Sequence, residues 1–173
     1  MKQKIISTLI SLCLLFGTGQ AALAVEIPEA LLNVKNISQP TQTQYGAGQP
    51  DLASFEAFAK AGVKHVINLR PPEETPGINA AAVVTRAGMA YYNIPISGVA
   101  DLTRDNVLLV GRLLKQIGNE PVLIHCSSSN RVGAVMALKA FWLEGVSRDE
   151  AIVTGNRWGL TKLQKRVEKI LDQ

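Results

Sequence analysis

The sequence predicts an α/β fold: a three-layer domain in which helices flank a mostly parallel sheet of four or five strands. Short strand patterns alternate with helical patterns at intervals of about 30 residues, the length of a βαβ unit. Glycines follow several helical patterns at positions where left-handed C-caps occur. The segment 132–143 is apolar on almost every face, as expected for a helix packed on a sheet. Strands joined through helices run parallel, so the pattern favours a parallel sheet.

The strand patterns are short runs rich in β-branched and aromatic residues. They cover residues 63–69, 90–94 and 121–125, and residues 27–48 are expected to add edge strands. The helical patterns cover residues 51–61, 78–87, 103–117, 131–144, 148–157 and 161–171. Asp51, Thr103 and Ser147 precede three of these helices as candidate N-caps, and Ser147 with Glu150 has the spacing of a capping box.

The first 24 residues have the pattern of a secretory signal. Lys2 and Lys4 precede an apolar run over residues 5–16, and residues 22–24 form a small-x-small cleavage site. The run is too short to span a bilayer comfortably. Cys13 does not follow the small residue that a lipoprotein signal requires. We therefore expect an exported protein, periplasmic or extracellular, with no stable membrane association after cleavage.

Residues 25–173 are predicted to form a single domain, since 149 residues suffice for one substantial core. Loss of two leader lysines lowers the net charge from +4 to +2, and no lysine or arginine run is present, so no nucleic-acid partner is expected. Of the two cysteines only Cys126 remains, which excludes an intramolecular disulfide. Two histidines and one cysteine cannot form a metal cluster by spacing, and we expect neither metal nor cofactor.

Cys126 lies between the apolar strand 121–125 and a helix that begins near Arg131. A loop that enters a helix N-terminus directs several backbone N–H groups to one point, where the helix dipole adds positive potential. A tetrahedral oxyanion fits there, and the same potential favours a nucleophilic thiolate. Arg131 has a planar guanidinium that can hold two phosphoryl oxygens at once.

The sequence from His125 and Cys126 through a short polar loop to Arg131 resembles the phosphate-binding loop of cysteine-dependent tyrosine and dual-specificity phosphatases. Over roughly residues 40–160 the chain is similar to the phosphatase-like domain of beta-lactamase-hydrolase-like proteins, and more distantly to atypical dual-specificity phosphatases of plants and fungi. The segments that carry the resemblance are 48–50, 66–71, 93–96 and 125–133.

This resemblance implies a dual-specificity-phosphatase-like fold and a phosphorylated protein or small molecule as substrate. Cys126 would attack phosphorus and form a cysteinyl-phosphate, and Arg131 with the backbone amides of 127–131 would hold the phosphoryl oxygens. His125 would support the loop and the thiolate. The remaining loop residues implied to bind substrate are Ser127, Ser128, Ser129 and Asn130.

Two further residues are candidates for the site. The resemblance implies a general acid on the loop after strand 90–94, where Asp101 is the first candidate and Asp105 the second. Both also lie where acids stabilise the start of a helix. If strand 63–69 runs parallel to strand 121–125, Arg70 emerges at the same sheet edge as Cys126. It can contact a second anionic group of the substrate there, or pair with Glu73 or Glu74.

The loop departs from the family pattern in three ways. Cys126 and Arg131 have Cys-x4-Arg spacing, one residue shorter than the usual Cys-x5-Arg, serine replaces the usual glycine, and Val132 replaces a hydroxyl residue. The shorter loop is typical of rhodanese-like sulfurtransferases, whose cysteine carries a persulfide. The alternatives to a phosphatase are therefore such a sulfurtransferase using Cys126, or a catalytically silent phosphate-binding module.

Overall fold

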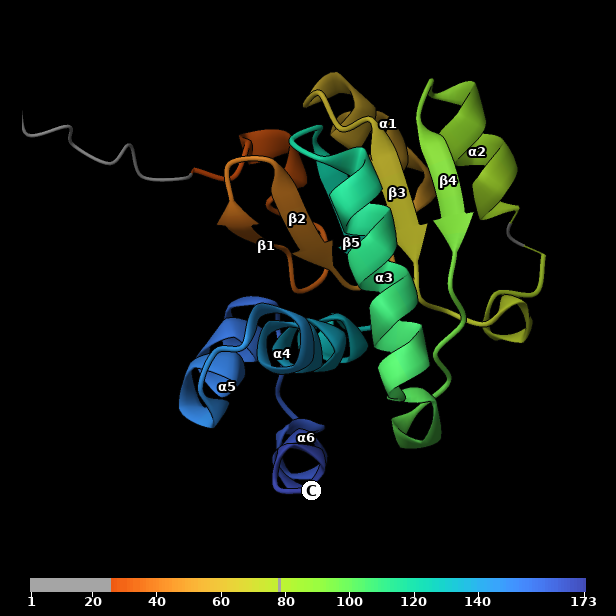
Figure 1. Cartoon of the computed structure of the whole chain (residues 1–173). Helices are drawn as coiled ribbons and strands as arrows, with labels where there is room; N and C mark the ends of the chain where they lie inside the picture. The colour runs from red at the N-terminus through yellow and green to blue at the C-terminus, as the bar shows by residue number, and fades with distance from the viewer. Residues whose placement is uncertain (1–25, 78) are drawn as a thin grey trace, which may run out of the picture.

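The computed structural model describes residues 26–77 and 79–173 (Figure 1). The secretory signal predicted for residues 1–24 lies outside these residues. The elements in chain order are η1 (Glu29–Leu31), β1 (Ser38–Thr41), β2 (Gln44–Ala47), α1 (Leu52–Lys60), β3 (His65–Asn68), η2 (Pro72–Glu74), α2 (Ala80–Arg86), β4 (Ala90–Asn93), η3 (Val99–Asp101), α3 (Arg104–Ile117), β5 (Val122–His125), α4 (Asn130–Glu144), α5 (Arg148–Arg157) and α6 (Gln164–Leu171). Each predicted strand and helix corresponds to one of these elements, with ends that differ by a few residues.

The sheet has five strands in the order β1-β2-β5-β3-β4. β1 is antiparallel to β2, and the other neighbouring pairs are parallel, which confirms the predicted α/β fold with a mostly parallel sheet. The expectation that residues 27–48 supply edge strands is correct for β1 and wrong for β2. β2 pairs with β1 on one side and with β5 on the other, and its residues Tyr45, Gly46 and Ala47 are buried.

The strand register brings two functional candidates to one edge of the sheet. Asn68 of β3 lies opposite His125 of β5, and Leu69 N donates to His125 O at 2.9 Å. The residues that follow these strands, Arg70 and Cys126, therefore emerge at the same carboxyl edge, as the predicted parallel topology requires.

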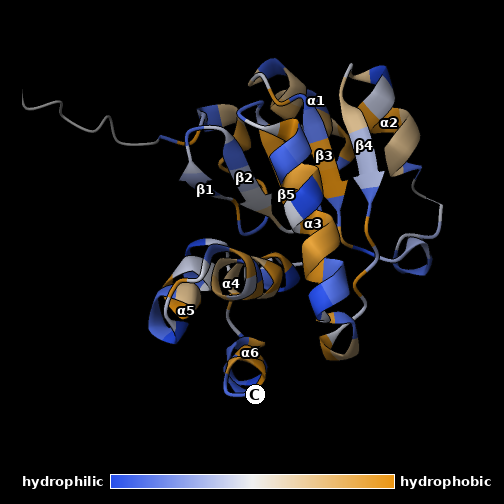
Figure 2. Ribbon diagram, viewed as in Figure 1, coloured by the Kyte–Doolittle hydropathy of each residue, from blue (hydrophilic) through white to orange (hydrophobic). Residues whose placement is uncertain are grey.

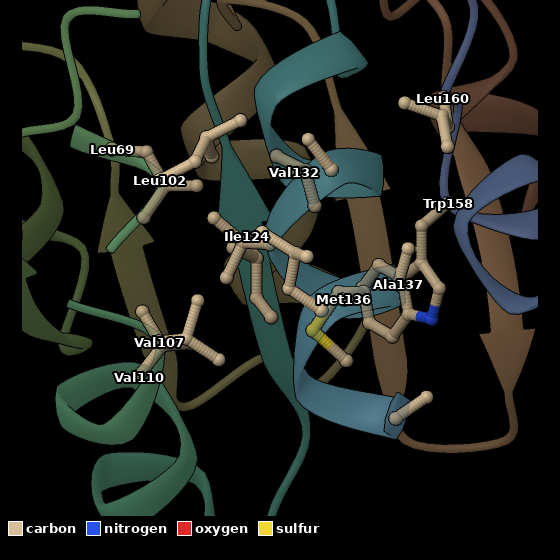
Figure 3. Close-up of a cluster of buried hydrophobic side chains, with 14 of the residues drawn as sticks. Leu69, Leu102, Val107, Val110, Ile124, Val132, Met136, Ala137, Trp158 and Leu160 are labelled. Atoms are coloured by element: carbon tan, nitrogen blue, oxygen red, sulfur yellow. The ribbon is translucent and has the colours of Figure 1, made fainter. Parts of the chain in front are cut away.

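Helices cover both faces of the sheet and produce two separate cores. Leu123 of β5 packs with Phe55 and Phe58 of α1 on one face, while its neighbour Ile124 packs with α3 and α4 on the other. Figure 3 shows the second core, where Val110 of α3, Ile124 of β5 and Met136 of α4 meet. Side chains of adjacent strand residues point to opposite faces, so β3 and β5 supply both cores, whereas β2 supplies only the core on the α1 face.

The predicted N-caps are confirmed. Asp51 accepts from Ser54 N, Thr103 accepts from Asn106 N, and Ser147 with Glu150 forms a capping box. α3 carries hydrophilic as well as hydrophobic residues along its length (Figure 2), and its buried residues Val107, Val110, Leu114 and Ile117 line the inner face. Within the part of the chain that the structure describes, no helix has the length and apolar character needed to cross a bilayer.

α4 and α5 approach each other closely at a pair of glycines. A Cβ on Gly133 of α4 would lie 2.2 Å from Leu160 N, and one on Gly155 of α5 would lie 2.9 Å from Gly133 O. No side chain fits between backbones at these distances, so glycine at 133 fixes how α5 and the residues after it lie on α4.

Candidate active site

Cys126 is the first residue after β5 and lies at the start of the loop that leads into α4. Its backbone N donates to Ala47 O of β2 at 3.2 Å, and the residue is fully buried. The loop then turns at Ser129, which adopts a left-handed conformation with φ of 61°. α4 begins at Asn130, so Arg131 projects from the first turn of this helix.

The backbone of this loop offers a set of unpaired donors. The amide groups of Ser127, Ser128, Asn130, Arg131 and Val132 donate to no protein acceptor in residues 26–77 and 79–173. The last three belong to the first turn of α4, where N–H groups have no intrahelical acceptor. Unpaired amides at a helix N-terminus form a site suited to an anion.

The Arg131 guanidinium is buried and firmly held beside this loop. Nη1 donates to Ile96 O at 2.6 Å and to Glu74 Oε1 at 2.7 Å. Nη2 donates to Glu74 Oε2 at 2.7 Å and to Ser127 Oγ at 3.1 Å. Burial disfavours the charged guanidinium, but the hydrogen bonds to Glu74 and the charge of nearby Cys126 outweigh it and raise the pKa of Arg131. Arg131 is therefore always protonated and lies close to the Cys126 sulfur.

Glu74 is the residue of this site that sequence reasoning did not place. The sequence suggests Glu74 only as a partner of Arg70, yet its carboxylate binds both Arg131 and Arg70. Hydrogen bonds from Arg131 are the main reason that the pKa of Glu74 lies below its ordinary value. Glu74 precedes Arg131 by 57 residues, and no local pattern in the sequence links the two.

Arg70 reaches the carboxyl edge, as the topology predicted, and is engaged there by protein groups. Nε donates to Glu74 Oε2 at 3.1 Å, Nη2 donates to Glu74 O at 2.6 Å, and Nη1 donates to Gln49 Oε1 at 2.7 Å. Of the two alternatives for Arg70, the pairing with Glu74 is present in the structure, and contact with a second anionic group of the substrate stays a prediction.

Asp101 lies at the end of η3, on the loop that follows β4. Its Oδ2 accepts from Ser97 N at 2.7 Å, and its backbone O accepts from Asn106 Nδ2 at 2.8 Å. These contacts stabilise the loop and the start of α3. The same loop contacts the anion site through Ile96 O, which accepts from Arg131.

The polar residues of the loop have different surroundings. Ser127 Oγ contacts Arg131, whereas Ser128 O accepts from Asn36 Nδ2 at 3.0 Å. Ser129 is fully buried, and its hydroxyl donates to Trp158 O at 2.8 Å. The Asn130 side chain accepts from the amides of Thr161 and Leu163 at 2.9 and 3.3 Å. Ser129 and Asn130 thus tie the loop to the segment between α5 and α6.

His125 is enclosed behind the loop. It is fully buried at the end of β5, and its ring lies edge-to-face against Phe55 with centroids 5.7 Å apart. Neither ring nitrogen has a hydrogen-bond partner among the described residues. Burial is the main cause that lowers the pKa of His125 to about 3; the Cys126 backbone acts in the opposite direction, and the positive charge of Arg70 adds to the lowering. The imidazole is therefore neutral at physiological pH and cannot form an ion pair with a Cys126 thiolate.

No group of three or more His, Cys, Asp or Glu side chains in the described segments is placed to hold a metal ion. The chemistry available at the site comes from the thiol, the guanidinium, the unpaired amides and the nearby carboxylates.

Comparisons with solved structures agree with this architecture. A DUF442 protein from Shewanella putrefaciens CN-32 aligns with a TM-score of 0.65 and 23% identity, covering 83% of this chain and 95% of that chain. TpbA of P. aeruginosa, solved in complex with pTyr, aligns with a TM-score of 0.60 and 20% identity over 78% of this chain and 81% of that one. At these identities the likeness concerns the fold.

Sequence comparison adds the family. The beta-lactamase hydrolase-like protein of Xylella fastidiosa is 33% identical over 117 residues, which are 65% of this chain and 27% of that protein. The chain thus spans about a quarter of the length of this relative. The model of the phosphatase-like domain of beta-lactamase hydrolase-like proteins matches residues 40–141, which include Cys126 and Arg131. This chain therefore belongs to the family of the phosphatase-like domain of beta-lactamase hydrolase-like proteins.

Proposed function

We propose that this protein hydrolyses phosphate monoesters through a cysteinyl-phosphate on Cys126. The observation that carries the proposal is the meeting of three features at one loop: the Cys126 sulfur, the Arg131 guanidinium and a row of unpaired amides. Phosphoryl transfer requires mainly positioning and charge stabilisation, and these groups supply both.

The reaction proceeds in two displacements. The Cys126 thiolate attacks phosphorus, the S–P bond forms, and the P–O bond to the leaving group breaks. Water then attacks the phosphocysteine, the P–S bond breaks, and inorganic phosphate leaves with the thiolate restored. Arg131 and the loop amides hold the equatorial oxygens in both steps, where negative charge is greatest.

The stabilisation of the thiolate is assigned to the helix and to Arg131. A neutral His125 contributes no charge, whereas the N-terminus of α4 and the guanidinium both favour an anion at sulfur. His125 contributes packing behind the loop, through its contact with Phe55.

Asp101 is proposed as the general acid that protonates the leaving oxygen. Its loop contacts Arg131 through Ile96 O, and this contact keeps the loop beside the anion site. The Asp101 carboxylate accepts from Ser97 N, and rotation of the side chain would release it toward the substrate.

The substrate class is a phosphorylated protein or small molecule, and the structural neighbour that binds pTyr supports an aryl phosphate as the first probe. We also propose that residues 1–24 are an export signal and that the protein acts in the periplasm or outside the cell. Protease accessibility in intact cells and spheroplasts tests this location.

The central test compares wild type with Cys126→Ser. We expect wild type to release phosphate from an aryl phosphate, with inhibition by vanadate, and Cys126→Ser to lose this activity while it still binds phosphate. Persulfide formation on Cys126 with thiosulfate, without phosphate release, would instead establish a sulfurtransferase. Phosphate binding without either activity would establish a silent anion-binding module.

A further inference from the structure

We propose that Glu74 is a positioning residue for Arg131, and that Arg70 acts on the site through Glu74 without touching the substrate. The inference rests on the proposed function, since both residues would act on the binding of the same phosphoryl group.

The distribution of hydrogen bonds around Arg131 shows which edge of its guanidinium is left for a ligand. Of the five N–H groups of an arginine, both on Nη1 and both on Nη2 have protein acceptors. Nε has no partner among residues 26–77 and 79–173. Glu74 takes the end of the guanidinium, between Nη1 and Nη2. On the lateral edge, formed by Nε and Nη2, the hydrogen bond that does not involve Glu74 is the one from Nη2 to Ser127 Oγ, at 3.1 Å.

A phosphoryl group can use this lateral edge in a bidentate manner if it replaces the weak contact with Ser127. Glu74 does not have to leave, because it occupies the other edge. The carboxylate and Ile96 O together fix the rotation of the guanidinium, so its lateral edge is oriented before the ligand arrives.

Arg70 holds Glu74 in turn. It contacts the Glu74 carboxylate through Nε and the Glu74 backbone through Nη2, and Gln49 takes Nη1. Its own backbone N donates to Asn68 Oδ1 at 2.8 Å, which anchors it to the end of β3. The Arg70 side chain is 13% exposed, and each of its three nitrogens already has a protein acceptor. Arg70 therefore supports Glu74, and each of its guanidinium nitrogens is already held by a protein acceptor.

The test is a double-mutant cycle on Glu74→Gln and Arg70→Ala. kcat and KM are measured with an aryl phosphate, and Kd is measured with tungstate, an oxyanion that is not hydrolysed. We expect Glu74→Gln to lower kcat by about 10- to 100-fold, the cost of misplacing a catalytic group, with KM changed by no more than a few-fold. Arg70→Ala should also lower kcat, but by a smaller factor. The double variant should have the same kcat and the same tungstate Kd as Glu74→Gln alone, because Arg70 acts only through Glu74.

Two further variants separate positioning from a general structural effect. Glu73→Gln makes the same change of charge at the exposed neighbouring residue and should behave as wild type. Arg70→Lys keeps a donor for Glu74 and should recover part of the kcat lost in Arg70→Ala, which a loss of folding stability alone would not produce.

Other outcomes overturn the inference. If Arg70→Ala raises KM, leaves kcat unchanged and has an effect that is additive with the effect of Glu74→Gln, Arg70 binds substrate directly. If Glu74→Gln raises kcat/KM and tightens tungstate binding, Glu74 competes with phosphate. If wild type binds tungstate, the Kd values of the four proteins show the expected non-additivity, and no phosphate ester is hydrolysed, the proposed function is refuted and the positioning roles remain. A wild type that neither binds nor hydrolyses would refute both.

Discussion

The buried neutral imidazole of His125 makes a quantitative prediction about stability and pH. The pKa of this histidine is lowered from 6.5 to about 3 by burial. Below pH 6.5 the unfolded chain takes up a proton at this residue and the folded chain does not, so folding stability falls as pH falls toward the folded pKa. The contribution of the neutral His125 to the unfolding free energy is fully present above pH 6.5 and is lost between pH 6.5 and about 3.

The size of the effect follows from linkage, which gives about 1.4 kcal/mol per pH unit for one proton. Between pH 7 and pH 5 the unfolding free energy should therefore fall by about 2 kcal/mol on account of His125. The chain has two histidines, so His65→Gln gives a background in which His125 is the remaining imidazole. Urea unfolding at pH 7, 6 and 5 would be compared between this background and the same background with His125→Phe.

The difference between the two profiles of unfolding free energy against pH gives the contribution of His125, because the carboxylates titrate in both proteins and cancel. Equal slopes in the two proteins would refute the reasoning. The chemical shift of the His125 ring offers a second measurement that needs no variant at this position: it should stay constant between pH 7.5 and 4.5. A titration with a midpoint near 6.5 would also refute the claim that the ring is held neutral by burial.

Three further predictions follow from the loop and its supports. In thermal unfolding, Gly133→Ala should lower stability by about 1–3 kcal/mol or more, since its Cβ would meet Leu160 N at 2.2 Å. Gly111→Ala is the control: its Cβ would meet only a movable Leu143 methyl, so its stability should be close to that of wild type. Asn130→Ala should lower stability by about 1 kcal/mol through loss of the acceptor for two amides, and Asn130→Asp, which keeps that acceptor, should restore it; equal losses in both would contradict this role. Arg131→Lys should lower kcat/KM for an aryl phosphate by about 100-fold or more, because an ammonium cannot hold two oxygens from one edge; an unchanged value would exclude Arg131 from the site.

Local patterns account for much of what the sequence predicted correctly. Thr103 and Ser147 cap their helices through contacts with residues three positions away, and this spacing is visible in the sequence. The Cys126 loop was also recognisable, because a buried strand, a polar turn and a helix start follow one another directly.

Contacts between distant segments could not be predicted in the same way. β2 is a short strand whose interior place depends on pairing with β5, almost 80 residues later. Asn130 has an ordinary place in a polar loop, and only the folded chain shows that it accepts from Thr161 and Leu163. Glu74 lay beside Arg70 in the sequence, and its second partner, Arg131, comes from another part of the chain.

The complete burial of Cys126 decides which reagents can reach its sulfur. Disulfide exchange requires three sulfur atoms in line, so a glutathione-sized disulfide needs an open approach that an enclosed thiol denies. Hydrogen peroxide is small enough to enter wherever a phosphoryl group can enter. In an oxidising compartment the lifetime of this thiol would therefore depend on peroxide rather than on the thiol–disulfide balance, and sulfenic acid would be its first oxidation product.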